Sequence, residues 1–187
     1  MAGKLEGKRI AILATEGFEQ SELFDPKQAL EEAGALTDVI SPMPGSIRGW
    51  KLKNWGDSID VDTALADADP ADYDALLLPG GVINPDHLRT NETAVAFVKA
   101  CAEAGKPIAA ICHGPWTLID AGVVRGRRLT SWPSLRTDLI NAGAEWVDAE
   151  VVTDDGLVTS RKPDDLPAFI AKMIEEIVEG QHSGATA

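Results

Sequence analysis

The sequence predicts an α/β protein in which a mostly parallel β-sheet carries helices on both faces. Predicted strands alternate with predicted helices along the chain, which is the order that produces parallel strands. The strands are short, continuous apolar runs, as expected for strands covered on both faces. A chain of 187 residues is long enough for one hydrophobic core and too short for two ordinary domains. We therefore expect a single domain over residues 1–187, with its core at about 8–178.

The first half of the chain alternates in this way up to residue 104. We expect strands over 8–14, 37–41 and 73–78, and helices over 20–33 and 91–104. Gly34 and Gly105 follow the two predicted helices, and glycine is common where a helix ends. The stretch 42–59 is irregular, and residues 47–53 within it are a candidate for a small hairpin.

The second half continues the same pattern. We expect strands over 107–111, 128–131, 147–153 and 157–160, and helices over 115–121, 133–141 and 163–178. The turn sequence Asp154-Asp155-Gly156 predicts a hairpin between the last two strands. The polar tail over 180–187 is expected to be disordered.

Four loops should meet at one edge of the sheet, since ligands of such sheets bind at the carboxyl ends of the strands. These loops are 15–19, 79–88, 112–114 and the segment after Ser131.

The net charge and the cysteine content of the chain restrict the classes of partner that it can bind and the cellular compartment in which we expect it. The formal net charge of −13 argues against binding to nucleic acid or to an anionic membrane, because phosphate recognition needs clustered Lys and Arg. The apolar run at 10–14 is too short for a signal peptide or a membrane span, so we expect a cytoplasmic protein. Cys101 and Cys112 form no Cys-x-x-Cys pair, so we expect free thiols, no metal site and no cofactor.

Cys112 stands out as a candidate nucleophile. It lies between a predicted buried strand and a predicted helix in Ala110-Ile111-Cys112-His113-Gly114. This order is that of a nucleophile elbow, in which small residues two positions away let the turn close. The helix N-terminus also favours a thiolate. Cys101 falls on the apolar face of a predicted helix and is expected to be a core residue.

A thiolate nucleophile generally needs a base, and the chain has three histidines. His182 lies in the polar tail, and His87 follows Gly80-Gly81 in a loop where it can equally be a solvated residue. His113 is adjacent to Cys112. A glutaminase-type triad would need a histidine and an acid in a folded segment far downstream, and the sequence has none. The base is therefore His113 or His87, or there is none.

Two further positions are candidates for the same site. Gly80-Gly81 ends a buried strand, so the N–H groups of Gly81 and His113 can form an oxyanion hole; a plain turn is the alternative. Glu22 lies at the start of the first predicted helix. It can reach back to the sulfur as a buried, protonated carboxyl, or it can simply be a solvated acid favoured by the helix dipole.

Several segments together resemble the ThiJ/PfpI family. They are 77–81 (LLPGG), 110–115 (AICHGP), 122–131 (GVVRGRRLTS), 141–148 (NAGAEWVD) and 159–167 (TSRKPDDLP). The chain resembles most the PfpI-type intracellular proteases and related bacterial stress proteins, which belong to the class I glutamine amidotransferase-like superfamily. The resemblance covers about 8–178.

This resemblance implies a flavodoxin-like three-layer sandwich with Cys112 as the nucleophile. It implies that Glu22 is the protonated carboxyl beside the sulfur and that Gly81 and His113 donate to the oxyanion. In the protease members an acid from a neighbouring subunit completes the site next to the histidine. The matching residue here is Asp86, where the protease that the chain resembles carries Glu.

Three functions follow as hypotheses. The first is a stress-protective cysteine hydrolase or lyase that acts on small carbonyl adducts, as a deglycase or a glyoxalase, or on peptides. The second is a non-catalytic stress protein or chaperone that senses oxidants through Cys112. The third, a glutaminase subunit, is disfavoured by the missing downstream histidine. The expected partner is another copy of the chain, in a dimer or a hexamer, with Trp50 and Trp55 as candidate interface or core residues.

Overall fold

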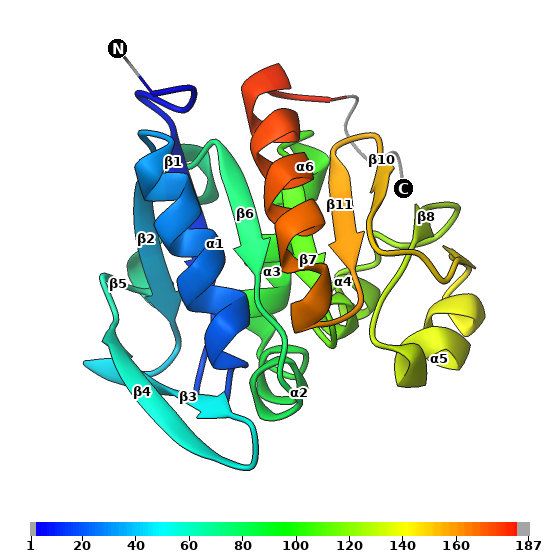
Figure 1. Cartoon of the computed structure of the whole chain (residues 1–187), viewed down its shortest axis with the longest axis horizontal. Helices are drawn as coiled ribbons and strands as arrows, with labels where there is room; N and C mark the ends of the chain where they lie inside the picture. The colour runs from blue at the N-terminus through cyan, green and yellow to red at the C-terminus, as the bar shows by residue number, and fades with distance from the viewer. Residues whose placement is uncertain (1–2, 183–187) are drawn as a thin grey trace.

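A computed structural model describes residues 3–182 and shows a seven-stranded sheet with helices on both faces (Figure 1). The strand order is β10-β11-β7-β6-β1-β2-β5. Neighbouring strands are parallel except for the β10–β11 hairpin. The strands are β1 (Arg9–Leu13), β2 (Leu36–Ser41), β5 (Thr63–Ala64), β6 (Ala75–Leu78), β7 (Ile108–Ile111), β10 (Val152–Asp154) and β11 (Leu157–Ser160). The predicted α/β sandwich is confirmed.

Alternate residues of the central strands supply two separate hydrophobic clusters, one on each face of the sheet. In β6, Leu76 and Leu78 belong to one cluster, while Ala75 and Leu77 belong to the other. All four residues of this strand are buried. This double burial explains why the strands have continuous apolar sequences.

The two faces are covered by different helices (Figure 1). Helices α1 (Gln20–Glu32) and α6 (Leu166–Glu179) pack against one face, and α3 (Glu92–Glu103) and α4 (Pro115–Asp120) pack against the other. Two shorter helices, α2 (Ile83–Leu88) and α5 (Arg136–Asn141), follow β6 and precede β9. The side chain of Asn91 accepts a hydrogen bond from the N–H of Ala94 and so caps α3.

Two small two-stranded sheets lie outside the main one, and they correct the predicted boundaries. The irregular stretch 42–59 contains a hairpin longer than 47–53, formed by β3 (Ser46–Lys51) and β4 (Asn54–Asp60). The predicted strand 128–131 shortens to β8 (Arg128–Leu129), which pairs with β9 (Glu145–Trp146) rather than with the main sheet. Of the predicted strand 147–153, only its last two residues fall in β10.

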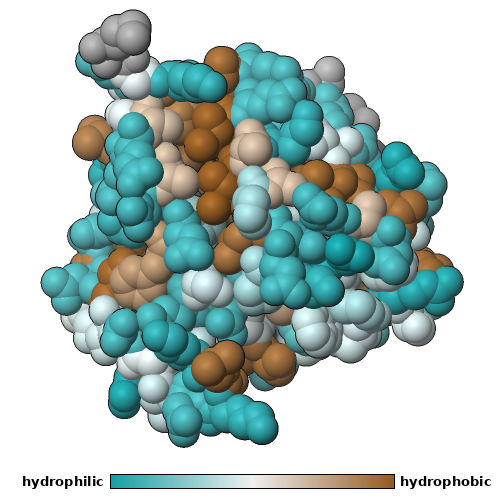
Figure 2. All heavy atoms as spheres, viewed as in Figure 1, coloured by the Kyte–Doolittle hydropathy of each residue, from teal (hydrophilic) through white to brown (hydrophobic). Residues whose placement is uncertain are grey.

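The tail begins in an ordered conformation. The backbone N–H of His182 donates to the carbonyl of Gly105 at 2.8 Å, so residues 180–182 dock on the domain, contrary to the expected disorder. The remaining tail residues, 183–187, lie outside the described residues. Within residues 3–182, no helix has the length and apolarity needed to cross a membrane. Figure 2 shows a largely hydrophilic face with a strip of hydrophobic side chains between α1 and α6.

Candidate active site

Cys112 occupies a strained turn between β7 and α4. Its φ of +62° lies in the left-handed region, which a non-glycine residue adopts only when the surrounding structure enforces it. Its N–H donates to the carbonyl of Ser160 at 3.0 Å, and its own carbonyl accepts from the N–H of Trp132 at 2.9 Å. These bonds hold Cys112 at the carboxyl edge of the sheet, in the geometry of a nucleophile elbow.

Glycines next to Cys112 are required by close backbone contacts. A Cβ on Gly114 would lie 2.7 Å from the carbonyl oxygen of Leu78 and 2.9 Å from that of Ile111. A Cβ on Gly80 would lie 2.7 Å from the Cβ of Cys112. Neither position can hold a larger residue without moving the backbone, so both glycines allow the elbow to sit against β6.

Glu22 reaches back from α1 to the sulfur and is fully buried, with 0% exposure. Its Oε2 accepts from the N–H of Gly80 at 2.8 Å. The carboxyl lies beside the Cys112 thiol, and its Oε1 has no hydrogen-bond partner among the described residues. Burial, reinforced by the nearby charge of Glu19, raises the pKa of Glu22 to about 8. The carboxyl is therefore protonated at neutral pH, and a solvated acid at the start of the helix is excluded.

The sulfur of Cys112 is in a polar but enclosed setting. Burial and the neighbouring Glu22 raise the pKa of the thiol, while the backbone N–H groups of Gly81 and His113 favour the thiolate. The thiol is 7% exposed, so the structure does not give it the low pKa of an open reactive cysteine. The ionisation of the Cys112 thiol is coupled to that of the Glu22 carboxyl, because two adjacent negative charges repel each other.

His113 is the base candidate that the structure brings to the sulfur. Its Nδ1 lies 3.2 Å from the Sγ of Cys112. Burial lowers the pKa of His113 to about 4, so the ring is neutral at neutral pH and is only a weak base. The ring lies between Trp116, at 5.0 Å between ring centroids, and Trp132, at 6.0 Å.

Ser134 is a site residue that the sequence reasoning missed. Its Oγ lies 3.4 Å from the Nε2 of His113, on the side of the ring that faces away from the sulfur. Ser134 comes from the segment after Ser131, which was expected at this edge of the sheet. No local sequence pattern, however, distinguishes this serine or Trp132 as a neighbour of His113.

Gly81 is placed to supply an N–H group beside the sulfur. Its φ is +79°, and a Cβ there would lie 2.5 Å from the carbonyl oxygen of Gly17. Its backbone N–H and that of His113 both lie near the sulfur and favour the thiolate form of Cys112. Two converging N–H donors are the arrangement that an oxyanion hole needs.

Asp86 and His87 are both exposed on α2. Among the described residues, the polar side-chain contacts of the His113 ring are with Cys112 and Ser134. Neither Asp86 nor His87 therefore completes a triad within one chain. Cys101 lies on α3 and is fully buried, and burial raises its pKa to about 11, as expected for a core thiol.

A family model described as the DJ-1/PfpI family matches residues 8–176. The chain belongs to the DJ-1/PfpI family. It is 46% identical to a deglycase of Thermococcus kodakarensis, with 89% of this chain and 98% of the relative covered. It is also 46% identical to protein/nucleic acid deglycase 2 of Escherichia coli (87% and 93% covered) and to General stress protein 18 of Bacillus subtilis (87% and 94%). A further relative in Bacillus subtilis, 46% identical with 87% and 94% covered, is named as a candidate cysteine protease, YraA.

Solved structures agree with the flavodoxin-like sandwich of this family. DJ-1beta of Drosophila melanogaster superposes with a TM-score of 0.81 and 30% identity, covering 91% of this chain and 90% of that one. A two-domain protein of Anabaena variabilis with a DJ-1/ThiJ/PfpI-like domain gives a TM-score of 0.86 at 33% identity. The match covers 96% of this chain and 50% of that longer protein.

Proposed function

We propose that the protein is a stress-protective, cysteine-dependent hydrolase or lyase that acts on small carbonyl adducts, as a deglycase or a glyoxalase-like enzyme. The observation that carries the proposal is the surroundings of the Cys112 sulfur. A protonated carboxyl from Glu22, a neutral ring nitrogen from His113 and two backbone N–H groups converge on it. The names of the deglycase relatives support the same substrate class.

The first step is addition of the Cys112 thiolate to an electrophilic carbon. With a free 2-oxoaldehyde such as methylglyoxal, the S–C bond forms, the carbonyl π electrons move to oxygen, and the oxygen takes a proton. With an amine adduct, the S–C bond replaces the C–N bond and the leaving amine takes the proton. The N–H groups of Gly81 and His113 are the candidate donors to the developing oxyanion.

The second stage converts the hemithioacetal into a hydroxy acid. A proton leaves the carbon that bears the sulfur and another joins the neighbouring carbonyl carbon. The hydroxyl on the first carbon gives up its proton and becomes the carbonyl of a thioester, while the oxygen on the second carbon takes a proton and becomes the hydroxyl. Water then cleaves the S–C bond and regenerates the thiol, so that the sum is methylglyoxal plus water giving lactate. The neutral Nδ1 of His113, at 3.2 Å from the sulfur, is the candidate carrier of these protons.

Peptides are the other substrate class that the PfpI resemblance offers. Proteolysis would need an open groove and an acid beside His113, and Asp86 of a neighbouring copy in a dimer or hexamer is the candidate. The exposed position of Asp86 on α2 is compatible with such a role. The enclosed sulfur, 7% exposed, favours small substrates over peptides. We expect the enzyme to act in the cytoplasm, where thiols stay reduced.

A second candidate function is redox sensing by Cys112, without turnover. The buried, protonated carboxyl of Glu22 next to the sulfur favours it, because that group can donate a hydrogen bond to an oxygen of an oxidised cysteine. Here peroxide is the oxidant, and two equivalents would convert the thiol to a sulfinate.

One comparison separates the enzyme from the sensor. Turnover of methylglyoxal, and of amine adducts freed of residual aldehyde, is measured for the wild type and for Cys112→Ala, with circular dichroism as a check of folding. We expect turnover by the wild type and a loss of at least about 100-fold in the variant. If neither substrate is consumed above background while peroxide oxidises Cys112 selectively, the sensor replaces the enzyme.

A further inference from the structure

We propose that Glu176, Glu179 and His182 form a binding site for a divalent transition-metal ion of the zinc type. The two glutamates lie at the end of α6, and His182 follows two residues after Gly180. This end of α6 is at the edge of the sheet opposite to the one where Cys112 lies (Figure 1). The site is therefore separate from the candidate active site.

The spacing of the three side chains fits a single ion. One ligand atom from each residue lies within 4.8 Å of the other two. Glu176 and Glu179 share a helix face because they are three residues apart, and Gly180, with a φ of +90°, turns the chain back toward them. The Oε2 of Glu176 lies 3.1 Å from the Nε2 of His182. This separation is close to the roughly 3.3 Å expected between two ligands about 2.0 Å from a tetrahedral zinc ion.

Two of these atoms are buried without a hydrogen-bond partner. Glu176 is 7% exposed, and neither its Oε2 nor the Nε2 of His182 makes a hydrogen bond within the described part of the chain. The two atoms lie 3.1 Å apart, but an N–H on the Nε2 of His182 would not point at the Oε2 of Glu176, so the pair makes no hydrogen bond. Converging lone pairs in a buried place are unfavourable unless a cation joins them.

The far nitrogen of the histidine ring lies near a carboxylate, as is common for a metal ligand. The Oδ1 of Asp155 lies 3.5 Å from the Nδ1 of His182, the side of the ring that points away from Glu176. A carboxylate on the far nitrogen is the usual support for a metal-binding histidine, because it leaves the lone pair on the other nitrogen. The ring also packs on Gly156, where a Cβ would lie only 2.8 Å from its Cδ2.

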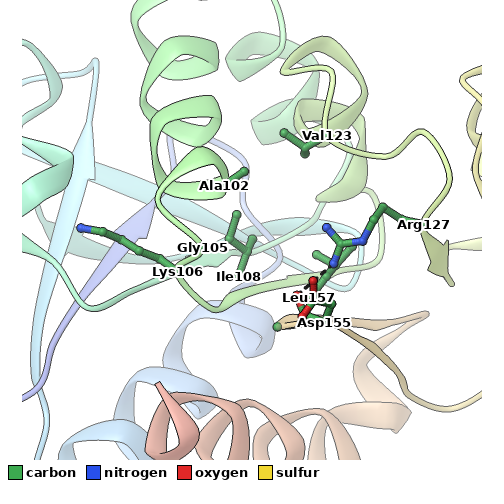
Figure 3. A pocket seen from close by; sticks show the side chains of 9 residues that line it. Ala102, Gly105, Lys106, Ile108, Val123, Arg127, Asp155 and Leu157 are labelled. Carbon is green, nitrogen blue, oxygen red and sulfur yellow. Dashed lines mark hydrogen bonds between the residues drawn. The ribbon is translucent and has the colours of Figure 1, made fainter. Parts of the chain in front are cut away.

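The backbone around the site is fixed before any ion binds. His182 is tied to Gly105 by its backbone N–H, and the side chain of Arg127 donates to the carbonyl oxygen of Asp155. Figure 3 shows Arg127, Gly105 and Asp155 around the small pocket beside the tail. A bound ion would join α6, the tail and the β10–β11 turn.

The donor set selects the class of ion. One imidazole nitrogen with two carboxylates suits zinc and its neighbours among the transition metals, whereas calcium and magnesium prefer oxygen ligands alone. Three protein ligands leave one position for water. The competing occupant is a proton, which would make His182 an imidazolium between Glu176 and Asp155.

The test uses the full chain without an affinity tag, stripped of metal, and titrated with Zn²⁺ and with Co²⁺. We expect Zn²⁺ at about 100 times its Kd to raise the Tm by about 5–10 °C. Co²⁺ should give a visible spectrum of nitrogen and oxygen ligation, without a thiolate charge-transfer band. His182→Ala and Glu179→Gln should each abolish both signals, whereas Cys112→Ser should keep them, because the thiol is not a ligand.

Matched controls come from the same chain. His87→Ala removes another histidine that is exposed on α2, and Glu175→Gln removes a carboxylate of α6 that contacts Lys172 at 2.9 Å. Both should keep the metal response, and His182→Ala should keep turnover by Cys112. The proposal is overturned if the wild type shows no zinc-dependent shift, if the shift survives His182→Ala, or if Cys112→Ser removes it. A lower Tm of His182→Ala without any metal response in the wild type would assign the cluster to a proton instead.

Discussion

Under the proposed function, the chemistry of Cys112 depends on the protonated carboxyl of Glu22. Burial alone raises the pKa of both groups, so an isolated thiol in this place would be inert. The protonated carboxyl changes this, because its O–H can donate to the sulfur once the thiol proton leaves. The N–H groups of Gly81 and His113 act in the same direction. We therefore propose that the reactivity of Cys112 comes from hydrogen bonds to the thiolate rather than from a nearby positive charge.

The pH dependence of stability tests the protonation of Glu22. The pKa of Glu22 rises from 4.5 to about 8 on folding, so this proton stabilises the fold fully below pH 4.5 and no longer once the pH has risen through about 8. Glu22→Gln does not titrate. We expect the free energy of unfolding of the variant to rise relative to the wild type by about 2–4 kcal/mol between pH 5 and pH 8. Urea denaturation at the two pH values measures this, and an unchanged difference would show that Glu22 ionises normally.

Ser134 is expected to position His113 rather than to react. Ser134→Ala removes the hydroxyl that lies 3.4 Å from the Nε2 of His113, so the ring should turn more freely beside the sulfur. We expect kcat for methylglyoxal to fall by about 2–10-fold with little change in KM, and Ser134→Thr to restore part of it. Ser58→Ala, at an exposed position on β4, is the control. A rise in KM with kcat unchanged would instead assign Ser134 to substrate binding.

At the scale of elements, the elbow depends on how closely β7 and α4 approach β6. Gly114 has a φ of −49°, so alanine there is not strained in its backbone and acts only through its Cβ contact at 2.7 Å from Leu78. We expect Gly114→Ala to lower the free energy of unfolding by about 1–3 kcal/mol and to slow alkylation of Cys112.

Gly122→Ala is the complementary control for the elbow. Gly122 has a φ of +73°, and no atom lies within 4 Å of the place that a Cβ would take. Alanine there therefore costs about 1 kcal/mol through the backbone alone and should leave alkylation unchanged. If Gly114→Ala and Gly122→Ala both slow the alkylation of Cys112, the cause is a general loss of stability rather than the contact at the elbow.

The elements that were predicted best are those whose sequences are set by burial on two sides. Strands such as β6 and β7 have four buried residues each, so their apolar runs are unambiguous. The hairpin β3–β4 was predicted only over 47–53, and the length of its second strand was missed because most residues of β4 are exposed, which leaves no apolar pattern. β8 lies within the predicted strand 128–131, but β9 and its pairing with β8 were missed because each strand has only two residues.

The same distinction applies to the candidate site. Three site residues could be placed from the sequence because they come directly after buried strands, at the carboxyl edge of the sheet. These residues are Gly81, Cys112 and His113. Whether Glu22 points inward depends on how α1 packs on the sheet, which its position in the first turn does not determine. Ser134 lies near His113 only because the chain returns to the edge after β8.

At the scale of the whole molecule, one sheet joins two hydrophobic clusters. Phe169 of α6 belongs to one of them and is 0% exposed. Trp116 and Trp146 pack against the other. Because alternate residues of each central strand enter opposite clusters, loss of packing on one face should loosen the strands that support the other. The two faces are therefore expected to unfold together.

Phe169→Ala tests this coupling. Removing the ring from a closed core should lower the free energy of unfolding by about 3–5 kcal/mol. Tryptophan fluorescence reports in part on the face opposite Phe169, through Trp116 and Trp146, whereas far-ultraviolet circular dichroism reports on the whole backbone. We expect both signals to shift by the same amount in urea, with coincident midpoints. A fluorescence midpoint that stays at its wild-type value while the dichroism midpoint falls would show that the two faces unfold independently and that the sheet does not transmit the loss of packing.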